Sequence, residues 1–362
     1  MVTGLGRAGR VAGGEALRVA LLGYGLSGRV FHAPVVTSVP GLRLAAVVTG
    51  SPERAAEAAA DLPGVQVLPD ADSVWERARD FDLVVVATPN RTHVPLGLAA
   101  VEAGLAVVVD KPLAPSPGEG QRLVDAASRA GVLLAPYQNR RWDGDLLTVR
   151  RLLDAGELGR VSRFESRLEI WRPVPKPGWR ETGTAEDAGG ILHDLGSHLV
   201  DQAMLLFGPV RRVYAEVSVR RSGVELDDDV FLALTHAGGV VSHLTASKAA
   251  PDAGPRFRVV GDRAAYVKHG TDVQEPHLRA GRRPGEPGFG EEPDASWGTV
   301  GAGGETRRVP TERGDWRAFY AGVERCLRGE GPVPVDPAGV VEGLRVLEAA
   351  RRSAAEGVTV TL

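Results

Sequence analysis

Three side chains capable of acid–base chemistry stand out in the sequence: Lys111, Asp194 and His198. Asp194 and His198 are four residues apart, so on an α-helix they would share one face, and Asp201 would continue that polar stripe. An imidazole can accept a proton near neutral pH, and a lysine ammonium can stabilise negative charge that develops on an oxygen atom. The set could therefore assist the removal of a proton and a hydride from an alcohol carbon. The ordinary alternatives are a structural pair on a helix and a surface lysine after a strand.

The helix that would carry the polar stripe also has an apolar one, which can face the core and leave the polar side chains to a cleft. This apolar stripe consists of Leu195, Leu199, Ala203 and Leu206. His193 and His198 are five residues apart and would point to different faces of an α-helix. We therefore expect no metal site there.

A glycine-rich sequence near the N-terminus could hold a dinucleotide. The motif G-x-G-x-x-G occurs twice, but the first copy, Gly4–Gly9, has no strand before it and falls in a leader, residues 1–16, that we expect to be flexible. The second copy follows the predicted strand Val19–Leu22 and opens a helical stretch, so its glycines can turn tightly and let a pyrophosphate approach the backbone. Its residues are Gly23, Tyr24, Gly25, Leu26, Ser27 and Gly28. Pro34 should kink or end the helix that follows.

The residues after the next strand bear on the choice of cofactor. A carboxylate there would bind the ribose hydroxyls of NAD, but the chain has Thr49 and Gly50, neither of which would repel a 2′-phosphate. Ser51, at a helix N-terminus, and Arg54 could bind that phosphate. We therefore expect NADP to be favoured over NAD. The alternative is that Ser51 and Arg54 are an ordinary helix cap and a surface cation.

A parallel α/β domain is needed to position these residues. From residue 17 to 138, short β-branched runs alternate with alanine-rich helical stretches, which is typical of a dinucleotide-binding Rossmann domain. The predicted strands are Val19–Leu22, Leu42–Thr49, Val65–Leu68, Leu83–Ala87, Ala106–Val109 and Val132–Tyr137. Lys111 would then lie just beyond the carboxyl end of a parallel strand, where open α/β sheets bind ligands.

Residues 139–362 show a different pattern and are expected to form an α+β domain for substrate binding and oligomerisation. A helix over Asp143–Ala155 precedes residues 163–170, in which apolar and charged residues alternate, as in a strand with one buried face. Turn-prone glycines separate the later strands, so the sheet should be open and largely antiparallel. The later strands are Val213–Val219, Val230–Leu234, Val240–Thr245, Arg256–Val260 and Ala264–Val267.

The end of the chain completes this domain. Residues 271–304 are rich in glycine and proline, so we expect a long irregular loop without a helix. Amphipathic helices over Asp315–Arg328 and Pro337–Ala355 should close the fold, and they could pack back on the Rossmann domain.

The composition of the 362 residues indicates a small-molecule partner. Lysine and arginine total 43 against 46 aspartate and glutamate, a net charge of −3, which gives no electrostatic drive toward nucleic acid or an anionic membrane. The single cysteine, Cys326, excludes an intrachain disulfide and fits a reducing compartment. No apolar run is long enough for a signal peptide or a membrane span, so we expect a cytoplasmic location.

Further motifs follow the predicted strands and lead into the polar helix. Thr88-Pro89-Asn90-Arg91-Thr92-His93 follows the fourth strand, Asp110-Lys111-Pro112 follows the fifth, and Gly189-Gly190 leads into His193-Asp194-Leu195-Gly196-Ser197-His198. With these motifs, the chain from about Val19 to its C-terminus closely resembles the Gfo/Idh/MocA oxidoreductases. Gly23–Pro34 and Asn139–Asp143 resemble most the NADP-dependent scyllo-inositol dehydrogenase group of that family.

Two positions depart from the family pattern. Asp110 stands where the family usually has glutamate, which shortens the carboxylate by one carbon and leaves Lys111 intact. Gln138 stands where the most similar group tends to have histidine. These differences bear on the identity of the substrate more than on the type of reaction.

The resemblance implies reversible hydride transfer between C4 of the nicotinamide and a secondary alcohol of a cyclic polyol or sugar. His198 would be the general base in oxidation, Lys111 would hydrogen-bond the reacting oxygen, and Asp194 would orient the substrate hydroxyl or His198. Besides the glycine motif, the expected cofactor contacts are Thr49, Ser51, Arg54, Thr88, Pro89, Asn90, His93, Asp110 and Lys111. Asn139, Arg172 and Trp179 would line the substrate pocket, although the last two could equally be loop packing. The exposed face of the C-terminal sheet would assemble a homodimer or homotetramer.

Two other functions stay open. A non-catalytic dinucleotide-sensing regulator occurs in this family, but it would be expected to lack the lysine or the histidine, and Lys111 and His198 are both present. An NAD-dependent glycosidase of the same fold would keep its cofactor bound and produce no net redox change. Release of NADPH from a free polyol, as opposed to release of an aglycone, distinguishes these activities.

Overall fold

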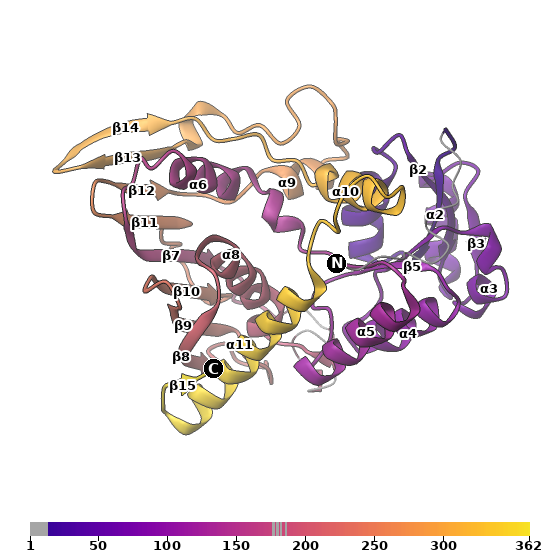
Figure 1. Ribbon diagram of the computed structural model, residues 1–362, viewed down its shortest axis with the longest axis horizontal. Coiled ribbons are helices and arrows are strands. Elements are labelled where there is room, and N and C mark those ends of the chain that lie inside the picture. Colours follow the sequence, from indigo (N-terminus) through magenta and orange to yellow (C-terminus); the bar gives the residue numbers. More distant parts are fainter. Residues whose placement is uncertain (1–13, 176–177, 179–180, 182, 185–186) are drawn as a thin grey trace. The chain divides into compact units, whose positions relative to one another are not determined.

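The computed structural model describes residues 14–175, 178, 181, 183–184 and 187–362. The chain forms two compact units, each built from several stretches of sequence (Figure 1). The first unit takes the chain up to Asn139 together with Gln274–Phe289 and Asp315–Val341. The second unit contains Arg140–Val273, Gly290–Gly314 and Glu342–Leu362.

A parallel sheet forms the centre of the first unit. Its strands are β1 (Leu17–Leu22), β2 (Leu42–Val48), β3 (Gln66–Leu68), β4 (Leu83–Val86), β5 (Ala106–Val109) and β6 (Leu134–Pro136). They are ordered β3-β2-β1-β4-β5-β6, and every neighbouring pair is parallel. The aliphatic residues of β4 and β5 are buried throughout, as a sheet covered on both faces requires. The predicted Rossmann fold is confirmed, and its strand order reverses at β1 and β4, where such sheets bind ligands.

Two of the connecting helices begin at a serine cap. Ser51 caps α2 (Pro52–Asp61) and Ser116 caps α5 (Pro117–Ala130), each by accepting a hydrogen bond from a backbone amide three residues on. Proline occupies the first position of both helices, where its missing amide costs no hydrogen bond. The first unit also contains α3 (Asp72–Trp75), α4 (His93–Glu102) and α10 (Arg317–Leu327).

The helical stretch after the glycine motif is not a regular α-helix. Ser27–His32 form a π-helical turn, and α1 (Ala33–Val36) follows with Pro34 in its first turn. Proline is tolerated there because the first amides of a helix have no intrahelical acceptor. The predicted interruption at Pro34 therefore takes the form of a change in helix geometry.

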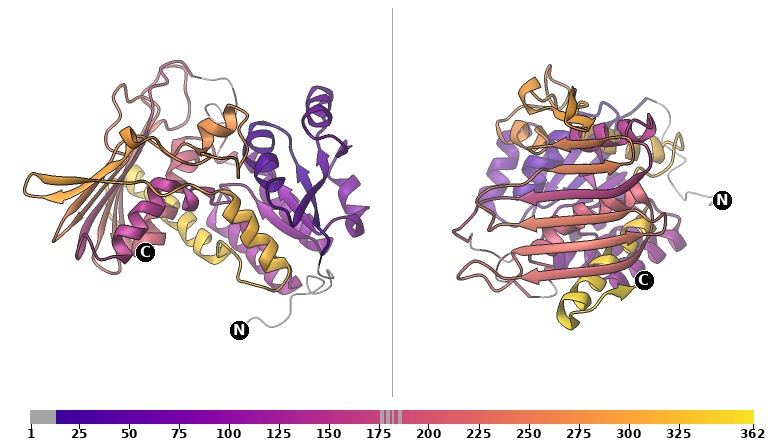
Figure 2. Two further views of the ribbon diagram at one scale, coloured as in Figure 1. Left: turned by 90° about the horizontal axis from the view of Figure 1, so that it is seen from above. Right: turned by 90° about the vertical axis from the view of Figure 1, so that its left-hand side faces the viewer.

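A nine-stranded mixed sheet forms the second unit, and Figure 2 shows it face-on. Its order is β14-β13-β12-β11-β7-β10-β9-β8-β15. Its strands are β7 (Val161–Glu169), β8 (Val210–Ser218), β9 (Asp229–His236), β10 (Val241–Ser247), β11 (Phe257–Gly261), β12 (Ala265–Lys268), β13 (Gly298–Ala302), β14 (Glu305–Val309) and β15 (Val360–Thr361). β7 and β10 are parallel, and the other neighbouring pairs are antiparallel, which confirms the predicted largely antiparallel sheet.

Helices cover one face of this sheet. α6 (Gly144–Asp154), α8 (Ser197–Phe207) and the C-terminal part of α11 (Pro337–Glu356) lie on that face (Figure 2). In the described part of the second unit, no helix lies on the opposite face. Phe164 and Leu168 of β7 are buried whereas Arg163 and Glu165 are half-buried, so the predicted alternation is confirmed.

The prediction of an irregular loop without a helix over residues 271–304 is wrong. The segment contains α9 (Gln274–Arg279), in which Pro276 is tolerated because it lies in the first turn. It also contains β13, which pairs with β12 and, across a Gly303-Gly304 turn, with β14. Backbone pairing and the burial of Leu278 stabilise these elements, and neither leaves a strong signal in a glycine- and proline-rich sequence.

Candidate active site

The glycine motif turns at the carboxyl end of β1, and each of its glycines meets a different requirement. Gly23 has a φ of +96°, and an added Cβ would lie 2.7 Å from the Ala87 carbonyl oxygen. A Cβ on Gly28 would overlap the Gly23 carbonyl oxygen. At Gly25 the nearest atom to an added Cβ belongs to the Arg54 guanidinium, 3.9 Å away. Because protein atoms leave room beside Gly25, the motif fits a pyrophosphate that approaches the backbone.

Thr49, Ser51 and Arg54 lie at the carboxyl end of β2. The Ser51 hydroxyl accepts a hydrogen bond from the Arg54 amide, and the Thr49 hydroxyl accepts one from the Ser51 amide, both at 3.3 Å. Ser51 is therefore a helix cap, but its hydroxyl hydrogen can still be donated to an anion. The Arg54 side chain is exposed beside Gly25. These groups fit a phosphate at the N-terminus of α2.

The loop after β4 supplies three further residues of the expected cofactor site. Pro89 is exposed, Thr88 is half-buried and Asn90 is buried. The Thr88 hydroxyl lies 2.6 Å from the Thr92 hydroxyl, which fixes the start of the loop. The loop thus lies at the same carboxyl edge of the sheet as the glycine motif.

Two side chains of the expected cofactor site point into the protein instead. His93 is fully buried, with its ring nitrogens 2.9 Å from the Thr88 carbonyl oxygen and 2.8 Å from that of Pro112. Burial lowers the pKa of His93. Tyr24 is also buried, and its hydroxyl donates to Asp61 at 3.1 Å. His93 therefore joins the loops after β4 and β5, and Tyr24 can offer a ligand its backbone rather than its phenol.

Asp110 connects the glycine motif to the lysine that follows β5. One carboxylate oxygen accepts a hydrogen bond from the Ser27 hydroxyl, and the other accepts one from the Lys111 amide at 2.7 Å. The imidazole of His32 lies 3.5 Å from the oxygen that Ser27 contacts. Burial would raise the pKa of Asp110, but His32 and Ser27 hold it well below the usual range. The ionised Asp110 therefore holds the backbone of Lys111 and the glycine motif together.

Asp194 and His198 lie where a π-helical segment, η7 (Leu192–Gly196), passes into α8. Asp194 is half-buried and His198 is 4% exposed. The sequence analysis expected Asp194 and His198 to share one face of an α-helix, in which residues four apart lie together. In a π-helix, residues five apart approach one face, so η7 interrupts that spacing. The sequence argument against a metal at His193 and His198 assumed a regular α-helix, which η7 does not form. Short π-segments are frequent at functional sites.

His193 itself faces a cation. Its Nδ1 lies 2.9 Å from the Arg351 guanidinium, and burial together with Arg351 lowers the pKa of His193 to about 4. A positive charge at that distance opposes the binding of a metal ion. Among the residues that the structure describes, no group of three or more potential metal-binding side chains occurs.

Gly190 and Asp227 fix the start of η7. Gly190 has a φ of +81°, and an added Cβ would overlap the Asp227 carboxylate. That carboxylate accepts a hydrogen bond from the Leu192 amide at 2.7 Å, and the Asp227 carbonyl accepts one from the Ile191 amide at 2.7 Å. Gly190 is thus required because the carboxylate caps η7. The sequence analysis missed Asp227. It belongs to a run of three aspartates, and nothing in that run indicates which carboxylate would cap a helix.

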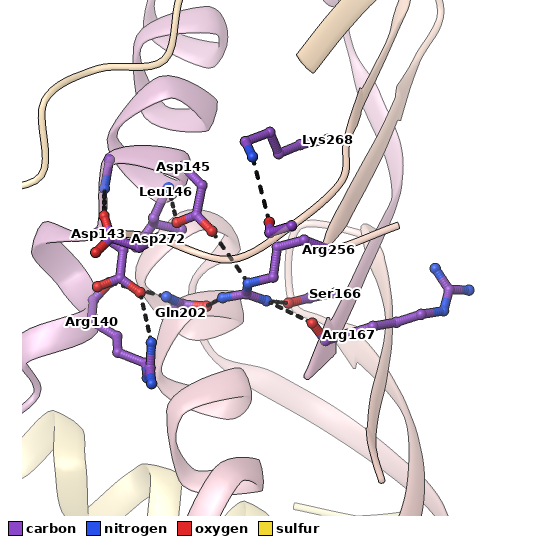
Figure 3. Close-up of polar contacts among 12 residues, drawn as sticks. Arg140, Asp143, Asp145, Leu146, Ser166, Arg167, Gln202, Arg256, Lys268 and Asp272 are labelled. Atoms are coloured by element: carbon purple, nitrogen blue, oxygen red, sulfur yellow. Dashed lines mark hydrogen bonds and ion pairs between the residues drawn. The ribbon is translucent and has the colours of Figure 1, made fainter. Parts of the chain in front are cut away.

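A buried polar cluster holds α8 in place further along (Figure 3). The Arg256 guanidinium donates to Gln202 of α8 at 2.8 Å and to the Ser166 hydroxyl at 2.6 Å. Its Nε lies 3.3 Å from the Asp145 carboxylate, so the buried positive charge is compensated. Gln202 in turn donates to the Arg140 carbonyl at 3.0 Å. The cluster therefore connects α8 with α6 and with strands of the sheet.

The third residue of the predicted polar stripe, Asp201, is also a structural anchor. Asp201 accepts two hydrogen bonds from the Arg141 guanidinium, at 2.7 and 2.8 Å. Bidentate pairs of this kind have a defined geometry, and both side chains are largely buried. Asp201 therefore anchors α8 through Arg141, and Asp194 and His198 stay the candidates for chemistry in the stripe.

Comparison with known proteins identifies both halves of the chain. Residues 17–138 match the oxidoreductase family with an NAD-binding Rossmann fold, and residues 146–267 match the GFO/IDH/MocA C-terminal domain. The chain belongs to the Gfo/Idh/MocA oxidoreductase family.

Relatives of this Gfo/Idh/MocA oxidoreductase match it over nearly its whole length. Scyllo-inositol 2-dehydrogenase (NADP(+)) IolW of Bacillus subtilis is 33% identical over 353 residues, 96% of either chain. The uncharacterized oxidoreductase YdgJ of Escherichia coli is 36% identical over 359 residues, 96% of this chain and 99% of YdgJ. The solved structure of the oxidoreductase yvaA from Bacillus subtilis has a TM-score of 0.89 at 32% identity, and covers 96% of this chain and 100% of its own.

Membership in the Gfo/Idh/MocA family confirms the predicted fold class and the predicted enzyme class, an NAD(P)-dependent dehydrogenase. The open space beside the Gly25 backbone is the structural feature that fits the pyrophosphate of the cofactor. In the described part of this oxidoreductase, no helix is both long and apolar enough to span a bilayer.

The Gfo/Idh/MocA oxidoreductase also contains a buried pair, His32 and Tyr320, that sequence reasoning missed. His32 Nδ1 lies 2.6 Å from the Tyr320 hydroxyl, and its ring packs on Tyr137 with centroids 4.2 Å apart. The other ring nitrogen of His32, Nε2, lies 3.5 Å from the Asp110 carboxylate. Tyr320 lies on α10, 288 residues from His32, so no local pattern could have joined them.

The predicted substrate residues of this oxidoreductase have different surroundings. Asn139 is buried just after β6. Arg172 has an exposed side chain, while its carbonyl accepts a hydrogen bond from Arg221 at 2.8 Å. Trp179, and the neighbouring Arg180, lie outside the described residues.

In this oxidoreductase, Gly25→Ala should bind the dinucleotide poorly and fold normally. The added methyl would meet no protein atom closer than 3.9 Å, but it would occupy the path of the pyrophosphate. We expect an unchanged Tm and a rise of at least about tenfold in the Kd for NADPH, measured by fluorescence titration. Gly28→Ala is the matched control, because its methyl would overlap the Gly23 carbonyl and should lower the Tm. Normal NADPH binding by Gly25→Ala would show that the pyrophosphate lies elsewhere.

Proposed function

We propose that this enzyme transfers hydride reversibly between NADP and a secondary alcohol of a cyclic polyol or sugar. The observation that carries the proposal is the placement of Lys111 at the carboxyl edge of the parallel sheet, tied through Asp110 to the glycine motif. Ligands bind at that edge in open α/β sheets. Similarity to IolW over 96% of the chain supports the substrate class.

In the proposed reaction, the bound nicotinamide supplies the hydride acceptor at C4. Lys111 donates a hydrogen bond to the reacting oxygen and stabilises the negative charge that develops there. His198 accepts the hydroxyl proton, and Asp194, which precedes it at the junction of η7 and α8, orients His198 or the substrate hydroxyl. We assign Lys111 and His198 to one chemical step.

The preference for NADP is a second part of the proposal. The two residues directly after β2, Thr49 and Gly50, carry no carboxylate, and Ser51 and Arg54 offer a hydroxyl, a helix N-terminus and a guanidinium to a 2′-phosphate. Arg54→Ala should raise the Kd for NADPH by about 10- to 100-fold and change that for NADH by less than about threefold. Arg54→Lys, which keeps the charge, should bind NADPH with intermediate affinity. Equal affinity of the unmodified enzyme for NADPH and NADH would contradict the preference.

The substrate class can be tested with a panel of inositols and aldoses, each assayed with NADP and NAD. Reduction of the cofactor by one or a few of these polyols, with the highest kcat/KM for a cyclic polyol or sugar, is the expected result. We assign Asn139, Arg172 and Trp179 to substrate recognition, so their alanine variants should raise KM more than they lower kcat. A panel without any cofactor reduction would contradict the proposed class.

We also propose that the uncovered sheet face of the second unit assembles a homodimer or homotetramer. Ala215 of β8 is buried, so its neighbour Tyr214 points to the opposite, uncovered face of the sheet. Tyr214 is 36% exposed there. A monomer measured by light scattering at micromolar concentration would contradict this assignment.

A further inference from the structure

A cavity of about 500 Å³ lies in the first unit beside the glycine motif. Tyr24 and Gly25 form one wall, α2 forms another, and the segment from Leu278 to Arg283 forms a third. The charged residues around it are five arginines, Arg29, Arg54, Arg279, Arg282 and Arg283, and two acids, Glu57 and Asp61. Guanidinium groups that converge on one cavity repel each other, so an anion bound there would be stabilised.

Most of these arginines already have a partner within the first unit. Arg29 donates to both Glu57 and Asp61, in the second case at 2.7 Å. Arg279 pairs with Glu275 at 2.8 Å. Arg282 donates to the Pro287 carbonyl at 2.7 Å. The guanidinium groups of these three arginines therefore already bind other groups of the protein.

Arg54 and Arg283 differ from the other arginines of the cavity. Within the described part of the chain, neither guanidinium makes a hydrogen bond or an ion pair. Arg54 lies beside Gly25, and Arg283 is close enough to Tyr24 for its charge to oppose the rise in the pKa of that phenol. Two uncommitted guanidinium groups thus line one cavity next to the glycine motif.

The wall that carries Arg283 is anchored to the fold. Gln274 at the start of α9 accepts a hydrogen bond from the Trp316 amide at 2.7 Å, and Leu278 at its other end is buried. Arg283 follows within a few residues of these anchors. A backbone segment held in this way loses less conformational entropy when it binds a ligand.

We propose that Arg283 forms, with Arg54, the binding site for a phosphate monoester, the 2′-phosphate of NADP. This inference rests on the proposed function and adds a specificity-determining residue from the C-terminal half of the chain. The cavity adjoins the glycine motif and the N-terminus of α2, where the adenosine end of a dinucleotide binds in Rossmann folds. A guanidinium fork matches the geometry of a phosphate better than an ammonium does.

The test measures dissociation constants of NADPH and NADH by fluorescence titration of the whole enzyme. Arg283→Ala should weaken NADPH binding by about 10- to 100-fold and NADH binding by less than about threefold. Arg283→Lys should recover part of the loss. Arg43→Ala is the matched control, because Arg43 is an exposed arginine of β2 outside the cavity, and its removal should change neither constant.

Competition experiments identify the phosphate that is bound. Adenosine 2′,5′-bisphosphate should compete with NADPH more strongly than AMP, and Arg283→Ala should reduce that difference by about 10- to 100-fold, whereas inorganic phosphate should compete weakly in both proteins. Equal losses for NADPH and NADH, or no loss for either, would overturn the role of Arg283 and leave the proposed function standing. If the unmodified enzyme bound neither dinucleotide, the proposed function would fail instead.

Discussion

His198→Asn is expected to lower kcat by about 10²- to 10⁴-fold, the usual contribution of a general base, with little change in the Kd of the dinucleotide. An asparagine amide is similar in size to imidazole but cannot accept the hydroxyl proton near neutral pH. His198 belongs to the second unit, while the residues assigned to the cofactor belong to the first, so binding and chemistry should separate. Stopped-flow assays under conditions in which hydride transfer limits the rate would measure the effect.

The control for this variant is a measurement that shows whether α8 keeps its position. Because Asp201 and Gln202 anchor that helix through Arg141 and Arg256, the substitution at residue 198 should leave its position intact. An unchanged Tm would show this. A His198→Asn enzyme with nearly normal kcat would remove the base from the mechanism and leave Lys111 as the candidate.

Lys111→Met should reduce kcat to a similar extent, because it removes the cation assigned to the developing alkoxide. The loop should keep its shape, since Asp110 holds the backbone amide of residue 111 and not its side chain. Lys111→Arg restores the charge with a different geometry and should recover only part of the rate. Rates measured with a saturating dinucleotide check this prediction.

The double variant tests whether the two groups act together. If Lys111 and His198 serve one step, Lys111→Met should cost little further activity in the His198→Asn background. Fully multiplicative losses would indicate that the two side chains act in separate steps.

The strands of both sheets were predictable where their sequence carries a strong local pattern. β1, β4 and β5 are aliphatic runs bounded by turn residues, and β7 alternates apolar and charged residues, so each has a periodicity that a sequence can reveal. β14, with four polar residues before Val309, has no such pattern. It forms because β13 offers it backbone hydrogen bonds.

The site was predictable only as far as motifs define it. The glycine motif and Lys111 could be placed because they follow recognisable strands, and the structure gathers them at one edge of the sheet. The burial of His93, the cap from Asp227 and the pair of His32 with Tyr320 depend on contacts between distant segments. The π-helical geometry of η7 has no local sequence pattern either, so the spacing of Asp194 and His198 predicted an α-helix instead.

The most direct test of the account is isotope transfer with a polyol substrate from the panel, deuterated at the carbinol carbon. We expect deuterium to appear at C4 of the nicotinamide in NADPH, with one ketone formed for each NADPH and a primary isotope effect on the rate. Release of an aglycone without net formation of NADPH would contradict it and identify a glycosidase. Tight dinucleotide binding without turnover of any polyol would also contradict it and indicate a regulator.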